Sequence, residues 1–168
     1  MVFVSLSILM TLSGAKLNFF LNTKYSDEDT LALAVRSSSL SVDFEAEKEM
    51  LELINAERVK VGIRPLVMDE TLIPVARKHA VDMWDRQYFA HDTPEGVTPF
   101  QRLKAGEVIF KRAGENLALA KDVERAHQGL MESEGHRKNI LDSSFGRVGI
   151  GVIDGGIYGK IFTQDFVD

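Results

Sequence analysis

The sequence has no cysteine in its 168 residues. Disulfide bridges, thiolate metal sites and a cysteine nucleophile are therefore excluded. The absence does not identify a cellular compartment, because many exported bacterial proteins also lack cysteine. A domain of about 125 residues can bury enough apolar surface to fold without covalent cross-links.

Positive charge is also in short supply. The chain carries 20 lysine and arginine residues against 25 aspartate and glutamate residues, so its formal net charge is -5. Because the sequence has no basic patch or stripe, nucleic acid is not an expected partner. Hydrophobic residues make up 45% of the chain and charged residues 27%, which is the balance of a globular protein rather than a disordered one.

The apolar run at the amino terminus, residues 2–12, is short. Its 11 residues cannot span a bilayer of roughly 30 Å as a helix, but they have the length of a signal-peptide core. Small residues follow at 13–15, where a peptidase could cut, although no lysine or arginine precedes the run. Residues 1–21 are therefore expected to be a signal peptide or a membrane-anchoring segment. The alternatives are the tail of a longer membrane helix and a buried helix.

Residues 22–42 are expected to be a linker, because serine-rich sequence favours solvated, flexible chain. Residues 43–168 are expected to form one domain that begins with helices. Apolar spacing, capping residues and glycines predict helices from about Asp43 to Gly62, Thr71 to Arg86, Thr98 to Leu103 and Asp122 to Gly135. Thr71 is the expected N-cap of the second helix and Gly135 the expected break of the last.

The end of the chain changes from helical to strand-like periodicity. The segments "FGRVGIGVID" and "IYGKIFTQDF" are rich in valine, isoleucine and phenylalanine, and Gly155 and Gly156 lie between them. This pattern predicts an antiparallel hairpin. Helices followed by a hairpin indicate the α+β class, with a small antiparallel sheet covered by helices.

Two of the four histidines stand out as candidates for chemistry. His79 and His127 lie within helical patterns, where packing is the simpler interpretation. His91 and His136 lie in turn-like sequence, His91 within "FAHDTPEG" and His136 within "EGHRKNIL". Loops on a rigid scaffold are where functional groups concentrate.

Glu115 is the third candidate, in the segment "AGENLALA". A carboxylate beside an apolar run must find a partner, because desolvating it alone is unfavourable. His91, His136 and Glu115 could together hold a divalent cation and leave one position open to water. Without a metal, Glu115 would hydrogen-bond a histidine and fix its tautomer.

The motifs resemble those of the CAP superfamily, named for cysteine-rich secretory proteins, antigen 5 and pathogenesis-related-1 proteins, and also called the SCP domain. The resemblance is to the short, cysteine-free bacterial branch and covers roughly residues 47–168. Seven segments occur in the family's order: "LINAERVKVGIRPL", "ARKHAVDM", "FAHDTPEGVTPFQRL", "GENLA", "GHRKNIL", "FGRVGIGV" and "FTQDF".

The resemblance implies a three-layer α-β-α sandwich and a cleft lined by two histidines and two acids. The histidines correspond to His91 and His136, and one acid to Glu115. The second acid would fall near Ser133, which Glu132 and Glu134 flank. Glu132 is the expected substitute, and a site of three residues with a serine is the alternative. The remaining motif residues are expected to be structural: Asn55, Arg58, Asn116, Asn139, Gly149 and Gly151.

The resemblance also implies an extracellular or cell-envelope protein with one of three functions. The first is a binding module whose cleft holds a divalent metal, zinc above all, on His91 and His136, or a lipid, wall fragment or peptide. The second is a metal-dependent hydrolase with Glu115 as general base, although GxSxG and HExxH are both absent. The third is a structural or adhesive envelope domain with an idle cleft.

Overall fold

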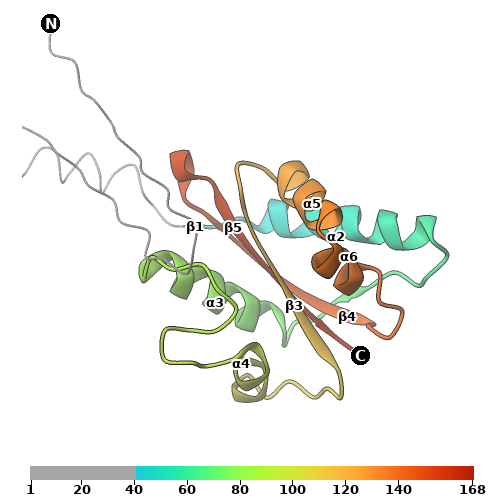
Figure 1. Ribbon diagram of the computed structural model, residues 1–168, viewed down its shortest axis with the longest axis horizontal. Helices are drawn as coiled ribbons and strands as arrows, with labels where there is room; N and C mark the ends of the chain where they lie inside the picture. Colours follow the sequence, from blue (N-terminus) through green and yellow to red (C-terminus); the bar gives the residue numbers. More distant parts are fainter. Residues whose placement is uncertain (1–40) are drawn as a thin grey trace, which may run out of the picture.

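A five-stranded sheet lies between two layers of helices in the computed structural model, which describes residues 41–168. Helices α2, α5 and α6 cover one face of the sheet, and α3 and α4 cover the other (Figure 1). This arrangement confirms the predicted α+β class and three-layer sandwich. The predicted amino-terminal segment, 1–21, and nearly all of the predicted linker lie outside the described residues.

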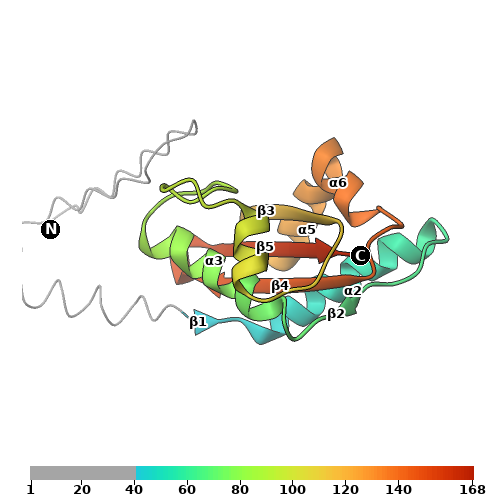
Figure 2. The ribbon, with the colours of Figure 1, turned by 90° about the horizontal axis from the view of Figure 1, so that it is seen from below.

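The elements follow the chain in this order: β1 (Ser41–Val42), α2 (Phe44–Lys60), β2 (Val67–Met68), α3 (Ile73–Asp85), α4 (Pro99–Ala105), β3 (Ala113–Ala120), α5 (Val123–Glu132), α6 (Glu134–Ile140), β4 (Arg147–Asp154), the 3-10 turn η1 (Gly156–Tyr158) and β5 (Lys160–Val167). The strand order is β1-β4-β5-β3, with β3 at one edge (Figure 2). These pairs are antiparallel, whereas β2 pairs with β4 in parallel. Within residues 41–168, no helix has the length and apolar character needed to span a membrane.

Strands β4 and β5 form the predicted antiparallel hairpin, with Gly151 opposite Thr163. The connection contains η1, so β5 begins at Lys160 rather than at the start of the apolar run. Side chains alternate between the two faces of the sheet. The larger core lies on the α2, α5 and α6 side, where β4 contributes Val148, Ile150 and Val152.

Two glycines of β4 allow α3 to pack closely against the sheet, as predicted. A β-carbon at Gly149 would lie 2.4 Å from the carbonyl carbon of Leu72, and one at Gly151 would lie 2.4 Å from the backbone nitrogen of Arg77. Any side chain at either position would collide with the helix backbone. These contacts explain why the α3 face of β4 carries no side chain at positions 149 and 151.

The predicted helices are present, with two corrections at their ends. Thr71 is not the N-cap of α3, because its backbone N–H and hydroxyl both donate to the carboxylate of Asp69, at 2.7 and 2.6 Å. This local turn delays the helix to Ile73. The other correction is that Ser133, not Gly135, separates α5 from α6. Ser133 has extended backbone angles, and Gly135 lies inside α6.

Candidate functional site

Three charged or polar side chains from separate elements form one hydrogen-bonded cluster. His91 lies in the loop before α4, Arg102 on α4 and Glu115 on β3. The His91 Nδ1–H donates to Glu115 Oε1 at 2.8 Å, and Arg102 Nη2 donates to Glu115 Oε2 at 2.5 Å. Arg102 Nη1 also donates to the backbone carbonyl of His91 at 2.7 Å, which ties the loop to the helix.

Sheet and helix geometry explain why these side chains meet. Glu115 projects from β3 toward α4, and its side chain is 2% exposed. Helix α4 starts at a complete capping box, in which Thr98 and Gln101 each bond the other's backbone N–H. The capped first turn fixes the position of Arg102 one turn further on. The Glu115 carboxylate therefore has two partners: the predicted histidine, which is His91, and the guanidinium of Arg102.

The cluster shifts the pKa values of the two candidate histidines in opposite directions. The hydrogen bond to the Glu115 carboxylate raises the pKa of His91 above its usual 6.5. Burial lowers the pKa of His136, and the charge on His91 lowers it further. The two rings are thus close enough to interact electrostatically. Of the two rings, His136 therefore loses its proton at the lower pH.

His136 is held near the cluster through its backbone. It lies in the first turn of α6, and its carbonyl accepts a hydrogen bond from Asn116 Nδ2 at 3.1 Å. Asn116 follows Glu115 on β3 and points to the opposite face of the sheet. Asn139 Nδ2 in turn donates to the carbonyl of Glu115 at 3.2 Å. The predicted structural role of both asparagines is confirmed.

The predicted fourth cleft residue lies in the junction between α5 and α6. Glu132 is exposed, and its carboxylate accepts a hydrogen bond from Gln128 at 2.8 Å. Ser133 is half-buried at the junction itself. The charged residues next to Glu115, apart from His91, come instead from two other elements. Arg102 lies on α4 and Asp165 on β5.

The predicted three-residue cation site is not assembled. Among residues 41–168, no three His, Cys, Asp or Glu side chains are placed to hold a metal ion. Both carboxylate oxygens of Glu115 are engaged, and the Arg102 cation beside them opposes a second positive charge. His91 Nε2 and the His136 ring are the nitrogens left for an ion, with Glu115 orienting His91 through Nδ1. Zinc on these two rings stays a prediction, which calorimetry on wild type and His136→Ala would test.

Asp165 is a buried acid that the sequence reasoning missed. It lies on β5 directly opposite Glu115, and it is 1% exposed. Burial and the neighbouring Glu115 charge raise the pKa of Asp165 well above its usual range. The signal was available, because Asp165 lies in "FTQDF" among apolar residues, as Glu115 does in "AGENLALA". Nothing in the sequence marks Arg102 as a site residue, because it lies within an ordinary helical pattern, from Thr98 to Leu103.

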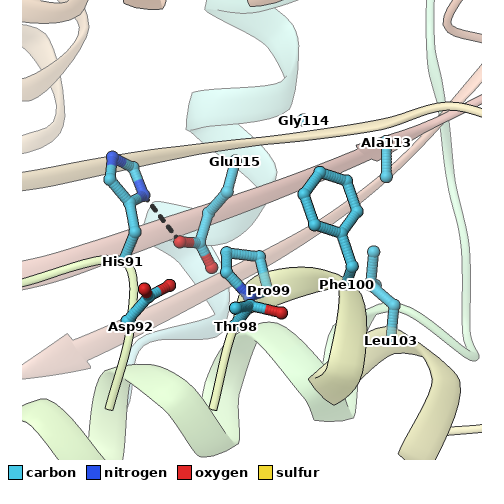
Figure 3. Close-up of a pocket in the computed structure, with 9 residues that line it drawn as sticks. All are labelled: His91, Asp92, Thr98, Pro99, Phe100, Leu103, Ala113, Gly114 and Glu115. Carbon is cyan, nitrogen blue, oxygen red and sulfur yellow. Dashed lines mark hydrogen bonds and ion pairs between the residues drawn. The ribbon is translucent and has the colours of Figure 1, made fainter. Parts of the chain in front are cut away.

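A pocket of about 310 Å³ opens beside the cluster, between β3 and α4 (Figure 3). Its apolar lining is Pro99, Phe100, Leu103 and Ala113 together with the backbone of Gly114. Its polar lining is His91, Asp92, Thr98 and Glu115. An apolar floor with a few polar groups at one side is the usual construction of a site for an organic ligand.

A model of the cysteine-rich secretory protein family, CAP, matches residues 51–166 of this sequence. The chain belongs to the CAP family. Its 44% identity over 122 residues to the uncharacterized Bacillus subtilis protein YkwD agrees with that assignment and covers 72% of this chain and 46% of the relative. The chain spans less than half the length of the curated Bacillus subtilis relatives that it matches.

Two solved CAP-like structures share the fold. An extracellular protein containing an SCP domain from Bacillus anthracis is 38% identical, with a TM-score of 0.66 over 73% of this chain and 40% of that one. An outer surface protein from Borrelia burgdorferi has a TM-score of 0.73 over 78% of this chain and 98% of that one. At 22% identity, the second similarity shows the fold alone.

The histidines of this CAP domain are expected to titrate in two groups. His91 should titrate above pH 6.5, and the three rings with lowered pKa values should titrate below it: His79, His127 and His136. NMR of the imidazole C–H protons against pH measures all four.

Because the folded pKa of His91 is the raised one, the stabilisation from its pair with Glu115 is present below about pH 6.5 and is lost as pH rises through the folded value. Glu115→Gln should lower the pKa of His91, and an unchanged value would contradict the pairing.

Proposed function

We propose that this chain is an exported or envelope-attached bacterial CAP-domain protein that acts as a binding module. Its ligand places an apolar group in the pocket between β3 and α4 and a polar group at His91. The observation that carries the proposal is the pocket itself, in which the Phe100 and Leu103 side chains lie next to the charged cluster. The extracellular relative from Bacillus anthracis supports the location.

The state of Glu115 favours binding over hydrolysis. A general base needs a free lone pair within reach of the proton that it removes. Both oxygens of Glu115 already accept hydrogen bonds, one of them from an arginine, and the side chain is 2% exposed, so a substrate water has little room to reach a free lone pair. The same bonds give His91 a fixed orientation and a positive charge below its raised pKa, which suits recognition of an anionic or hydrogen-bonding group.

Octanoate, an apolar chain with a carboxylate, is a suitable probe of the pocket. We expect saturable binding to wild type and about tenfold weaker binding to Phe100→Ala, since losing one aromatic wall removes roughly 1.4 kcal/mol of apolar contact. Calorimetry on the full chain measures both. Phe44→Ala is the matched control, because Phe44 is also exposed but lies on α2, across the sheet. Equal affinities for the two variants, or no binding to wild type, would contradict the proposal.

A further inference from the structure

Strand β3 has an open hydrogen-bonding edge. It is the last strand of the order β1-β4-β5-β3, and its pairing with β5 uses only one side of its backbone. In an antiparallel pair, alternate residues direct both backbone polar groups to the same neighbour. The Asp168 N–H donates to the Arg112 carbonyl, so Arg112 is one of the residues whose backbone groups face β5. Every second residue after it faces the same way: Gly114, Asn116, Ala118 and Ala120.

The intervening residues direct their backbone groups away from the sheet: Ala113, Glu115, Leu117 and Leu119. Within residues 41–168, only Asn139 bonds one of these outward groups, through the carbonyl of Glu115. A carbonyl oxygen has a second lone pair, so this contact leaves room for another donor. The outward N–H groups of Glu115, Leu117 and Leu119 are therefore available to a partner strand.

The sequence of this edge lacks the usual protection against strand pairing. Natural edge strands carry lysine, proline, a bulge or an inward-pointing charge that discourages pairing with another chain. Strand β3 reads "AGENLALA", with neither lysine nor proline, and its register with β5 is unbroken over eight residues. Its one inward-pointing charge, Glu115, is paired with His91 and Arg102, so it presents no unpaired charge that would discourage an incoming backbone.

The pocket adjoins this same edge. Ala113 and Glu115 project toward α4 and form part of the pocket wall (Figure 3). Residues directly opposite each other on paired strands point to the same face. A side chain paired with Glu115 would consequently enter the pocket against Phe100 and Leu103, while its neighbours would point to the α6 side, where His136 lies.

We propose that β3 receives an extended polypeptide segment as an additional strand, with one apolar side chain of that segment in the pocket between β3 and α4. The inference rests on the proposed binding function and names its ligand class. A row of unpaired backbone N–H and C=O groups is matched by another polypeptide backbone, which an acyl chain cannot replace. The pocket then supplies side-chain specificity and the edge supplies most of the polar contacts.

Amide hydrogen exchange tests the proposal on the full chain. The probe is a blocked heptapeptide in which threonine alternates with valine, leucine and valine. With nine tenths of the protein occupied, exchange at the outward amides of Glu115, Leu117 and Leu119 should slow about tenfold. The amides of Asn116 and Ala118, already bonded to β5, should not change. Protection at both sets or at neither would overturn the proposal.

Two methylated peptides provide the matched control. One carries backbone N-methyl groups on its apolar residues and the other carries them on its inner threonines. Each peptide therefore loses backbone N–H donors along one side of its strand only. One of the two should lose binding at least tenfold and the other should bind like the parent, because only one edge faces β3. Equal effects of the two would overturn the proposal, as would protection of the edge by self-association without peptide. Octanoate binding without any edge protection would leave the pocket function standing and remove only the peptide.

Discussion

Replacing Arg58 with methionine is expected to lower the free energy of unfolding by about 3–5 kcal/mol. The Arg58 side chain is fully buried, and its guanidinium donates to four backbone carbonyls. These belong to Arg64, Ile140, Asp142 and Phe145, at 2.9, 2.7, 2.9 and 3.0 Å. Methionine fills much of the volume but leaves the buried carbonyl acceptors without donors. Each unsatisfied carbonyl then costs its full desolvation penalty.

The loss is large relative to the stability of a typical domain, about 5–15 kcal/mol, and urea unfolding measures it. Lys60→Met on the same helix is the control, because the Lys60 side chain is 66% exposed and its one ion pair within residues 41–168 is with Glu57. That change should alter stability by about 0.5 kcal/mol or less. Comparable losses in the two variants would show that Arg58 does not hold the loops after α2 and α6 together.

Gly151→Ala is expected to destabilise the protein by about 3 kcal/mol or more. The added methyl group would lie 2.4 Å from the Arg77 nitrogen and 2.5 Å from the Ala76 carbonyl carbon. Both are backbone atoms of a helix, so no side-chain rotation can relieve the collision. Helix α3 would have to move away from β4, which would open the contact between the sheet and the helix that carries His79.

Gly129→Ala makes the same chemical change where space is free. Gly129 lies inside α5, and no atom lies within 4 Å of the position its β-carbon would take. Alanine is the better helix former, so stability should rise by about 0.5–1 kcal/mol. Thermal or urea unfolding of both variants gives the comparison. A Gly151→Ala protein as stable as wild type would mean that α3 and β4 are not in close contact.

The parts of the fold with strong local signals were predictable from the sequence. Thr98 is an N-cap, as its position before Pro99 indicated, and the helix expected to begin near Asp43 does begin there. The structural roles expected for Arg58, Asn116 and Gly151 also follow from their contacts. Each of these residues either sets its own local backbone or belongs to a motif with a known order.

Strand β3 was not assigned in advance, because "AGENLALA" combines glycine, asparagine and alanine, which have low strand propensity. Its structure comes from pairing with β5, about 50 residues later in the chain. The site was hard to predict for the same reason, because its residues come from segments that are far apart in the sequence. Local pattern selected His91 and Glu115 separately, but Arg102 and Asp165 join them only through helix placement and strand register.

The most direct test of this account is the location of a ligand on the CAP domain. Methyl NMR of the full chain during an octanoate titration reports each face of the sheet separately. We predict saturable shifts for the Leu103 methyl groups and none for Ile54 and Leu130, which pack in the core on the opposite face. Shifts confined to Ile54 and Leu130, or an unmoved Leu103 signal at saturating probe, would contradict the claim that the pocket beside His91 and Glu115 is the binding site.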